Sequence, residues 1–306
     1  MTFFATGGID LRRREFNQKL LLGAVAPTAI AAGCATSGGQ AERITGVDTH
    51  AHVFHRGLPF VPGRRYTPDY DATFEQYLAV LDANGISNGV VIPISILGTN
   101  NDYTLEAIRA SRGRLRGLAV IAPETGIDTI RSLAANGIAG VRFNLIGKPV
   151  PDFKAAPWRD LIDACRTVGW QVEVYDNAAR LPESLGALVD LGVNVVVDHF
   201  GKPSVKLGID DPGFRYLLGL GRTGRVWVKL SAPYRSSDAI AAAAAPLLLG
   251  AFGPQRLIWG SDWPHTGFEG KVRYAELLAQ LDRWVPDPQA RRVVLIDTPI
   301  KLFGFG

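Results

Sequence analysis

The sequence predicts an α/β protein built as a single (β/α)8 barrel, the TIM-barrel architecture. Between about residues 44 and 300, short apolar segments alternate with longer amphipathic stretches, and eight of the apolar segments are typical of strands. Several of them end on an ionisable side chain, as in barrels that assemble an active site at the carboxyl ends of their strands. The 306 residues also fit two ordinary domains. A barrel needs about 250, so residues 40–306 suffice for one.

The eight expected strands are short and mostly rich in valine and isoleucine. Parallel strands that are covered on both faces have this composition, because neither face meets water. In chain order, the strands are expected at Ile44–Asp48, Gly89–Ile94, Leu115–Ile121, Gly140–Asn144, Gln171–Tyr175, Val193–His199, Arg225–Leu230 and Leu257–Ser261.

The amphipathic stretches between the strands predict helices. Apolar residues recur in them at the spacing of one helix face, and glycine or asparagine marks several carboxyl ends. Strand–helix alternation of this kind implies right-handed βαβ units and a parallel sheet. The helices are expected at Thr73–Asn84, Ile127–Asn136, Pro157–Val168, Pro182–Leu191, Ala239–Leu249 and Tyr274–Trp284.

Eight parallel strands favour a closed barrel over the alternative, an open doubly wound sheet. The Gly-x-Gly-x-x-Gly turn that opens many such sheets does not follow the first strand. Residues 55–72 and 200–213 are the two longer segments expected as loops. Because the first of them follows the first strand, we expect it to lie over the barrel mouth.

Residues 1–39 differ in kind from the rest and predict an export signal. The pair Arg13–Arg14, with Phe16 behind it, resembles the twin-arginine motif. The apolar stretch of residues 20–32 follows this basic segment, and it is too short to span a membrane. The expected location of the protein is therefore the periplasm.

The two cysteines are expected to have different fates. The run Ala31–Cys34 resembles a lipoprotein cleavage box, although Ala31 replaces the usual leucine, so Cys34 is expected to carry a lipid anchor, the protein's one membrane contact. Plain signal-peptidase cleavage and a mis-assigned start codon are the alternatives. Cys165 would then be alone, which excludes an internal disulfide, and its spacing from Leu161 predicts a buried core thiol.

Composition and charge are those of an ordinary globular protein with a large core. The chain is 47% hydrophobic and 20% charged, and its net charge is +4. Its basic residues are scattered, without a dense run outside the N-terminus. We therefore expect no nucleic-acid partner.

Three polar runs carry the expected chemistry. His50 and His52 end the first strand as a His-x-His pair, and both imidazoles lie on one side because side chains alternate along an extended chain. His199 ends the sixth strand, and Asp262 follows the eighth. Loop hydrogen bonds, a satisfied core histidine or a helix cap would explain each of them alone. All four at strand ends of one barrel are better explained by a shared site.

These runs, Asp48–His52, Asp198–Gly201 and Gly260–Pro264, resemble the amidohydrolase superfamily. Within it they resemble the branch of 2-pyrone-4,6-dicarboxylate lactonase and the sugar-acid lactone enzymes. The resemblance covers roughly residues 45–304 and is specific for the branch, not for a substrate. Three further segments add to it: Arg64–Pro68, Gly140–Asn144 and Ser231–Arg235.

The superfamily at large implies a metal centre, but this chain departs from its pattern. Strand four ends with Arg142 and strand five with Tyr175, where a bridging ligand and a histidine belong. A single ion would still have four candidate ligands: His50, His52, His199 and Asp262. Arg142 would place a fixed positive charge beside such an ion. Because the lactonase that the chain resembles works without a metal, no cofactor is expected.

The resemblance implies a metal-free hydrolysis. In it, the imidazoles of His50, His52 and His199 donate hydrogen bonds to the lactone carbonyl and hold the oxyanion. Asp262 takes a proton from the attacking water as the general base. The tetrahedral intermediate then collapses and the ring opens.

The expected partner is a small anionic lactone. Arg142 and Arg235 each follow a strand and can hold carboxylates through two hydrogen bonds. Lys148 and Lys202 stand where the resemblance would place arginines, and a lysine offers only a point charge. An aldaric (galactaro- or glucaro-) lactone is therefore at least as well matched as the flat pyrone diacid. Tyr66, Ser95 and Tyr175 are candidate hydroxyl partners; loop packing or solvation is the alternative role of these secondary residues.

Three other functions stay open at this point. A lactone isomerase of the same branch would use a substrate hydroxyl in place of water. A metal-dependent amidohydrolase or decarboxylase would lose its activity with a chelator. A periplasmic binding protein would keep the barrel without the reaction.

Overall fold

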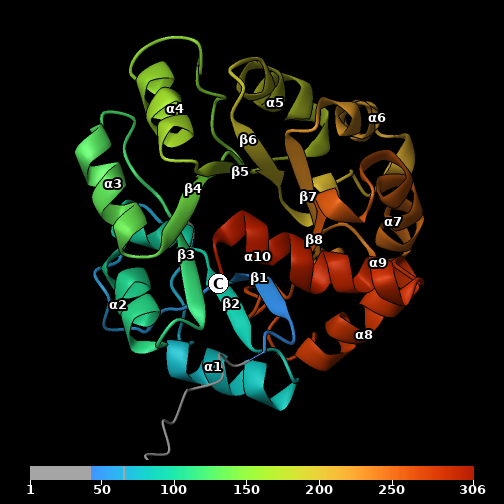
Figure 1. The fold of residues 1–306 in the computed structure, drawn as a ribbon, viewed down its shortest axis with the longest axis horizontal. Coiled ribbons are helices and arrows are strands. Elements are labelled where there is room, and N and C mark those ends of the chain that lie inside the picture. Colours follow the sequence, from blue (N-terminus) through green and yellow to red (C-terminus); the bar gives the residue numbers. More distant parts are fainter. Residues whose placement is uncertain (1–42, 65) are drawn as a thin grey trace, which may run out of the picture. The chain divides into compact units, whose positions relative to one another are not determined.

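The computed structural model describes residues 43–64 and 66–306, and Arg43–Gly306 form one compact unit. The predicted export signal, residues 1–39 with Cys34, lies outside the described residues. Eight parallel strands follow one another in sequence order around the sheet, and helices surround them (Figure 1). The predicted single (β/α)8 barrel is thus confirmed. Within the described ranges, no helix is long and apolar enough to cross a bilayer.

All eight expected strands are present, with ends that differ by a few residues. The first begins three residues later than expected, so that His50 lies within it. The strands are β1 Val47–Ala51, β2 Asn88–Val91, β3 Leu115–Ala119, β4 Ile138–Asn144, β5 Gln171–Tyr175, β6 Asn194–Val197, β7 Val226–Ser231 and β8 Leu257–Gly260.

The six expected helices are also present. The sequence analysis missed α2, because its buried face includes Thr104 and Ala107 and so lacks a clear apolar stripe. It also missed α6, α9 and α10. The helices are α1 Phe74–Ala83, α2 Asp102–Ala110, α3 Ile127–Ala135, α4 Trp158–Thr167, α5 Leu181–Asp190, α6 Pro212–Gly219, α7 Asp238–Phe252, α8 Tyr274–Trp284, α9 Pro288–Arg292 and α10 Thr298–Phe303.

Hydrogen bonds between β8 and β1 close the barrel. The backbone N–H of Asp262 donates to the carbonyl of His50 at 2.8 Å, and that of His52 donates to the carbonyl of Trp263 at 2.7 Å. The Asp48 carboxylate accepts from the backbone N–H of Ser261 at 2.8 Å and from its hydroxyl at 2.6 Å. These bonds hold the carboxyl ends of the two strands together.

The barrel interior has an apolar layer and a polar one. Val47, Ile92 and Val196 belong to a buried apolar cluster, which Phe303 of α10 and Phe305 complete. Because side chains alternate along an extended chain, Asp198, two residues after Val196, faces the same interior. That polar layer lies toward the carboxyl ends, where barrels carry their chemistry.

Candidate active site

A cavity of about 500 Å³ opens at the carboxyl ends of the strands. The loop of residues 55–72 contributes five residues to its wall, from Tyr66 to Tyr70, which confirms its expected place over the barrel mouth. Eight of the predicted site residues line the cavity: His52, Tyr66, Ser95, Arg142, Tyr175, His199, Arg235 and Asp262.

Three predicted site residues lie elsewhere. His50 is fully buried behind the cavity wall. Lys148 lines an adjoining cavity of about 470 Å³, which shares Ser95 and Arg142 with the first. Lys202 lines neither of these two cavities. Its ammonium donates to the side-chain oxygen of Asn177 at 2.7 Å.

Hydrogen bonding determines which nitrogen of His50 faces the site. The Lys229 ammonium lies 3.0 Å from Nδ1 of His50, and an ammonium can only donate. This contact favours the tautomer in which Nδ1 accepts and the ring hydrogen is on Nε2, although Oδ1 of Asp198 also lies 3.3 Å from Nδ1. This Nε2 lies 3.6 Å from Oδ1 of Asp262. Burial and Lys229 hold the pKa of His50 well below its usual value, so the ring is neutral.

His52 has the opposite arrangement. Its Nδ1 lies 2.8 Å from the carbonyl oxygen of Ile92, which can only accept, so Nδ1 carries the hydrogen. Nε2 lies 3.4 Å from Oδ1 of Asp262. A neutral ring in this arrangement would present a lone pair to the site through Nε2, whereas the sequence analysis assigned an N–H donor to it.

His199 follows β6 in a short turn with a left-handed φ of 52°. Its Nδ1 lies 2.8 Å from the Ser231 hydroxyl, and its ring centroid is 4.8 Å from that of His50. Burial lowers the pKa of His199 to about 3, so its imidazole is neutral and can act as a donor through one nitrogen.

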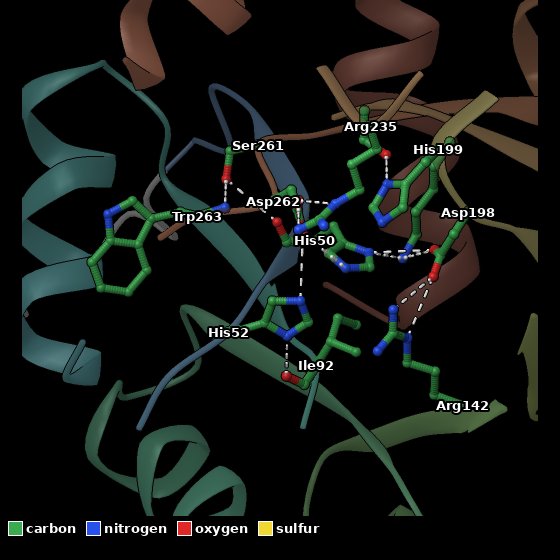
Figure 2. A network of polar contacts seen from close by, with 12 residues as sticks. His50, His52, Ile92, Arg142, Asp198, His199, Arg235, Ser261, Asp262 and Trp263 are labelled. Atoms are coloured by element: carbon green, nitrogen blue, oxygen red, sulfur yellow. Dashed lines mark hydrogen bonds and ion pairs between the residues drawn. The ribbon is translucent and has the colours of Figure 1, made fainter. Parts of the chain in front are cut away.

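The Asp262 carboxylate lies at the centre of the site (Figure 2). Its Oδ2 accepts from the Tyr234 hydroxyl at 2.8 Å and from Nε of Arg235 at 2.7 Å. Its Oδ1 faces His50 and His52. Burial alone would raise the pKa of Asp262, but Arg235 above all, together with the neighbouring histidines, holds it well below its usual range. The carboxylate is therefore ionised.

Both predicted carboxylate-binding arginines already have partners within the protein. Arg142 is buried, with Nη2 3.0 Å from Oδ2 of Asp198 and Nε 3.4 Å from Oε1 of Glu173. Arg235 is paired with Asp262, as described above. A substrate carboxylate would thus join or replace these ion pairs.

Comparison with known proteins identifies the family of this chain. A family model described as amidohydrolase matches residues 47–305. This chain belongs to the amidohydrolase family. It is 32% identical over 270 residues to a 4-sulfomuconolactone hydrolase from Hydrogenophaga intermedia, an alignment that covers 84% of this amidohydrolase and 88% of the relative. A D-galactarolactone isomerase from Agrobacterium fabrum is 26% identical, with 84% and 90% of the two chains covered.

A solved structure is also similar to this amidohydrolase. It is that of a provisionally assigned 2-pyrone-4,6-dicarboxylic acid hydrolase from Pseudomonas putida. The two chains are 40% identical and superpose with a TM-score of 0.81, which covers 86% of this chain and 98% of that one. The branch that the sequence motifs resembled is thereby confirmed.

Two groups of side chains among the described residues have ligand atoms close enough to hold a metal cation. Ligand atoms of His50, His199 and Asp262 lie within 4.8 Å of one another, a set that omits His52, the fourth ligand considered from the sequence. In the tautomer that the Lys229 contact favours, however, Nε2 of His50 carries a hydrogen and has no lone pair to offer. Arg235 already neutralises the Asp262 carboxylate at 2.5 Å. A second set, His50, Glu173 and Asp198, surrounds the Lys229 ammonium.

Four side chains of the site were missed by the sequence analysis. Glu173, Asp198 and Lys229 are fully buried and lie against His50 and Arg142. Tyr234 donates to Asp262. Glu173 and Lys229 could have been found from the sequence, because each is a charged residue inside an apolar strand. Such a residue needs a partner in the barrel interior.

Burial of His199 should make the stability of the protein depend on pH. The pKa of His199 falls from about 6.5 to about 3 on folding, because burial disfavours its charged form. The unfolded chain binds the extra proton between these values, so this stability is fully present above about pH 6.5 and is lost as the pH falls. We expect His199 to contribute a loss of about 2 kcal/mol by about pH 5.

Urea unfolding at about pH 7.5 and about pH 5 measures this loss. The variant His199→Gln should lose less stability than the wild-type protein over the same interval. Equal losses in the two proteins would contradict the assignment.

Proposed function

We propose that this amidohydrolase is a metal-independent lactonase that hydrolyses a carboxylate-bearing lactone. The observation that carries the proposal is the convergence of His50 and His52 on Oδ1 of Asp262, with the His199 ring beside that of His50 and two arginines lining the same cavity. The names of the two hydrolases similar to this chain, for 4-sulfomuconolactone and for 2-pyrone-4,6-dicarboxylic acid, also describe cyclic esters that bear anionic groups.

Substrate binding is proposed to activate the base. In the free protein, Arg235 pairs with Oδ2 of Asp262 and contributes to its low pKa. A substrate carboxylate that draws the guanidinium toward itself would weaken this ion pair. The pKa of Asp262 would then rise toward its usual value, and its carboxylate would become a stronger base. The base would thus be most effective when an anionic substrate is in place.

In the proposed reaction, two imidazoles hold the oxyanion and two groups handle the proton. His50, through Nε2–H, and His199 donate to the lactone carbonyl oxygen as it becomes negative. Asp262 accepts a proton from water, and the lone pair of His52 beside Oδ1 can share it. The water oxygen bonds to the carbonyl carbon, the ring C–O bond breaks, and the proton passes to the leaving oxygen.

The proposed substrates are an aldaric (galactaro- or glucaro-) lactone or 2-pyrone-4,6-dicarboxylate. Tyr66, Ser95 and Tyr175 line the cavity, so hydroxyl groups are present for a polyhydroxylated ring. Lys148, at the adjoining cavity, would place its charge on a distal carboxylate. Two carboxylates held at the Arg142 and Lys148 ends would favour a dianion over a neutral lactone.

A lactone isomerase is the second candidate, because one relative carries that name. Turnover in water labelled with oxygen-18 separates the two reactions. Hydrolysis by activated water predicts one labelled oxygen in the new carboxylate of the product. An unlabelled product, with the substrate mass unchanged, would establish isomerisation instead.

A further inference from the structure

Lys229 is a buried cation that the proposed reaction does not use directly. It lies within β7, and its side chain is fully buried. Its ammonium contacts three acceptors: Oε2 of Glu173, Nδ1 of His50 at 3.0 Å and Oδ1 of Asp198 at 3.4 Å. An ammonium has three hydrogens and no lone pair, so each of these contacts can receive one of them.

The contact with His50 selects one of two tautomers. If Nδ1 accepts from Lys229, the ring hydrogen must be on Nε2. The other tautomer is also within reach, because Oδ1 of Asp198 lies 3.3 Å from the same Nδ1 and could accept a hydrogen from it. Without the ammonium, that second arrangement would leave the Nε2 lone pair facing the site.

The choice of tautomer matters because Nε2 of His50 faces Asp262. Among the described residues, neither Nε2 of His50 nor Oδ1 of Asp262 has a hydrogen-bond partner, although both atoms are buried. A buried polar atom without a partner is costly, so both are positioned for a ligand. An Nε2–H can donate to an oxyanion, whereas an Nε2 lone pair can only accept or bind a cation.

We propose that Lys229 is a positioning residue that fixes His50 in its Nε2–H tautomer. The selected tautomer makes His50 a donor and removes it from the set of metal ligands. The donor role of His50 rests on the proposed lactonase function, but the tautomer itself does not. A metal-binding site and an oxyanion site with the same histidines would then differ by one buried ammonium.

Nitrogen-15 NMR of protein labelled at histidine tests the tautomer, because protonated and unprotonated ring nitrogens have well-separated shifts. The His50→Gln spectrum identifies the signals of His50. The wild-type protein should show the hydrogen on Nε2. In Lys229→Met, the hydrogen should move to Nδ1, where Asp198 accepts it, and kcat for a lactone substrate should fall about 10²-fold.

Removal of one buried cation could unfold the protein, so a double variant completes the test. Lys229→Met with Glu173→Gln removes both ionisable side chains of the Lys229–Glu173 contact together, and it should also show the Nδ1–H tautomer. Lys206→Met, at an exposed position, should leave the His50 signals and kcat unchanged. Zinc ions, added to the wild-type protein as a probe of metal binding, should leave the Nε2–H signal of His50 in place.

Three results would overturn the proposal: a wild-type His50 with its hydrogen on Nδ1, a double variant that keeps Nε2–H, or wild-type protein in which zinc abolishes the Nε2–H signal. A failure of the lactonase function is distinguishable from these. In that case the wild-type protein would show the expected tautomer and would turn over no lactone.

Discussion

Replacement of Asp262 by asparagine is expected to lower kcat by about 10²–10⁴-fold, the range for a positioned general base. The amide is close in size to the carboxylate, but it cannot accept the proton of the attacking water. Oδ1 of Asp262 is the carboxylate oxygen that faces His50 and His52, so the loss should appear in the chemical step. Steady-state kinetics with a carboxylate-bearing lactone measure it.

A second carboxylate in the same cavity provides the matched control. Asp69 lines the cavity from the loop over the barrel mouth and is exposed. Asp69→Asn should change kcat by less than about threefold, because an exposed carboxylate is screened by solvent and salt. Asp262→Asn with an unchanged kcat would show that another group activates the water.

Replacement of Arg142 by methionine is expected to destabilise the protein by about 3–5 kcal/mol, the cost of breaking a buried ion pair from one side. Arg142 is 5% exposed and bridges Asp198 and Glu173. Its removal leaves these two buried carboxylates with Lys229 as their remaining cation among the described residues. Urea unfolding measures the change in the free energy of unfolding.

An exposed arginine isolates the effect of burial in this comparison. Arg131 pairs with Asp128 at 3.3 Å on the surface of α3, and its side chain is 61% exposed. Arg131→Met should therefore cost no more than about 1 kcal/mol. Similar costs for the two variants would mean that the buried charges around Arg142 contribute little to folding.

The strands could be predicted from the sequence because parallel strands bury both faces. A valine-rich segment such as that of β6 can be recognised as a strand from its own sequence, without knowing which strands lie beside it. The site residues at strand ends, His199 and Asp262 among them, stood out because each interrupts an apolar segment with an ionisable group. Predicting the position of such a residue requires only its place along its own strand.

The pairings within the site could not be predicted in the same way. Arg142, Glu173, Asp198 and Lys229 come from or directly follow four neighbouring strands, β4 to β7. Which carboxylate meets which cation depends on the register between the strands and on side-chain direction. The sequence analysis therefore expected Arg142 to be available for substrate, whereas it is tied to two acids.

Local backbone geometry explains the orientation of the His52 ring. Both histidines were expected to donate to the oxyanion, since their spacing places them on one side of β1. The ring of His52 instead uses its N–H for the carbonyl oxygen of Ile92, just beyond β2. That contact depends on where β2 ends relative to β1. The spacing of His50 and His52 in the sequence carries no information about this.

The central claim is a lactone hydrolysis that needs no metal, and turnover by metal-stripped protein tests it most directly. Protein dialysed against chelator would be assayed with galactarolactone, glucarolactone and 2-pyrone-4,6-dicarboxylate. The account predicts that at least one lactone is hydrolysed at the same rate before and after stripping. Activity that disappears with the chelator and returns with zinc or manganese would contradict it.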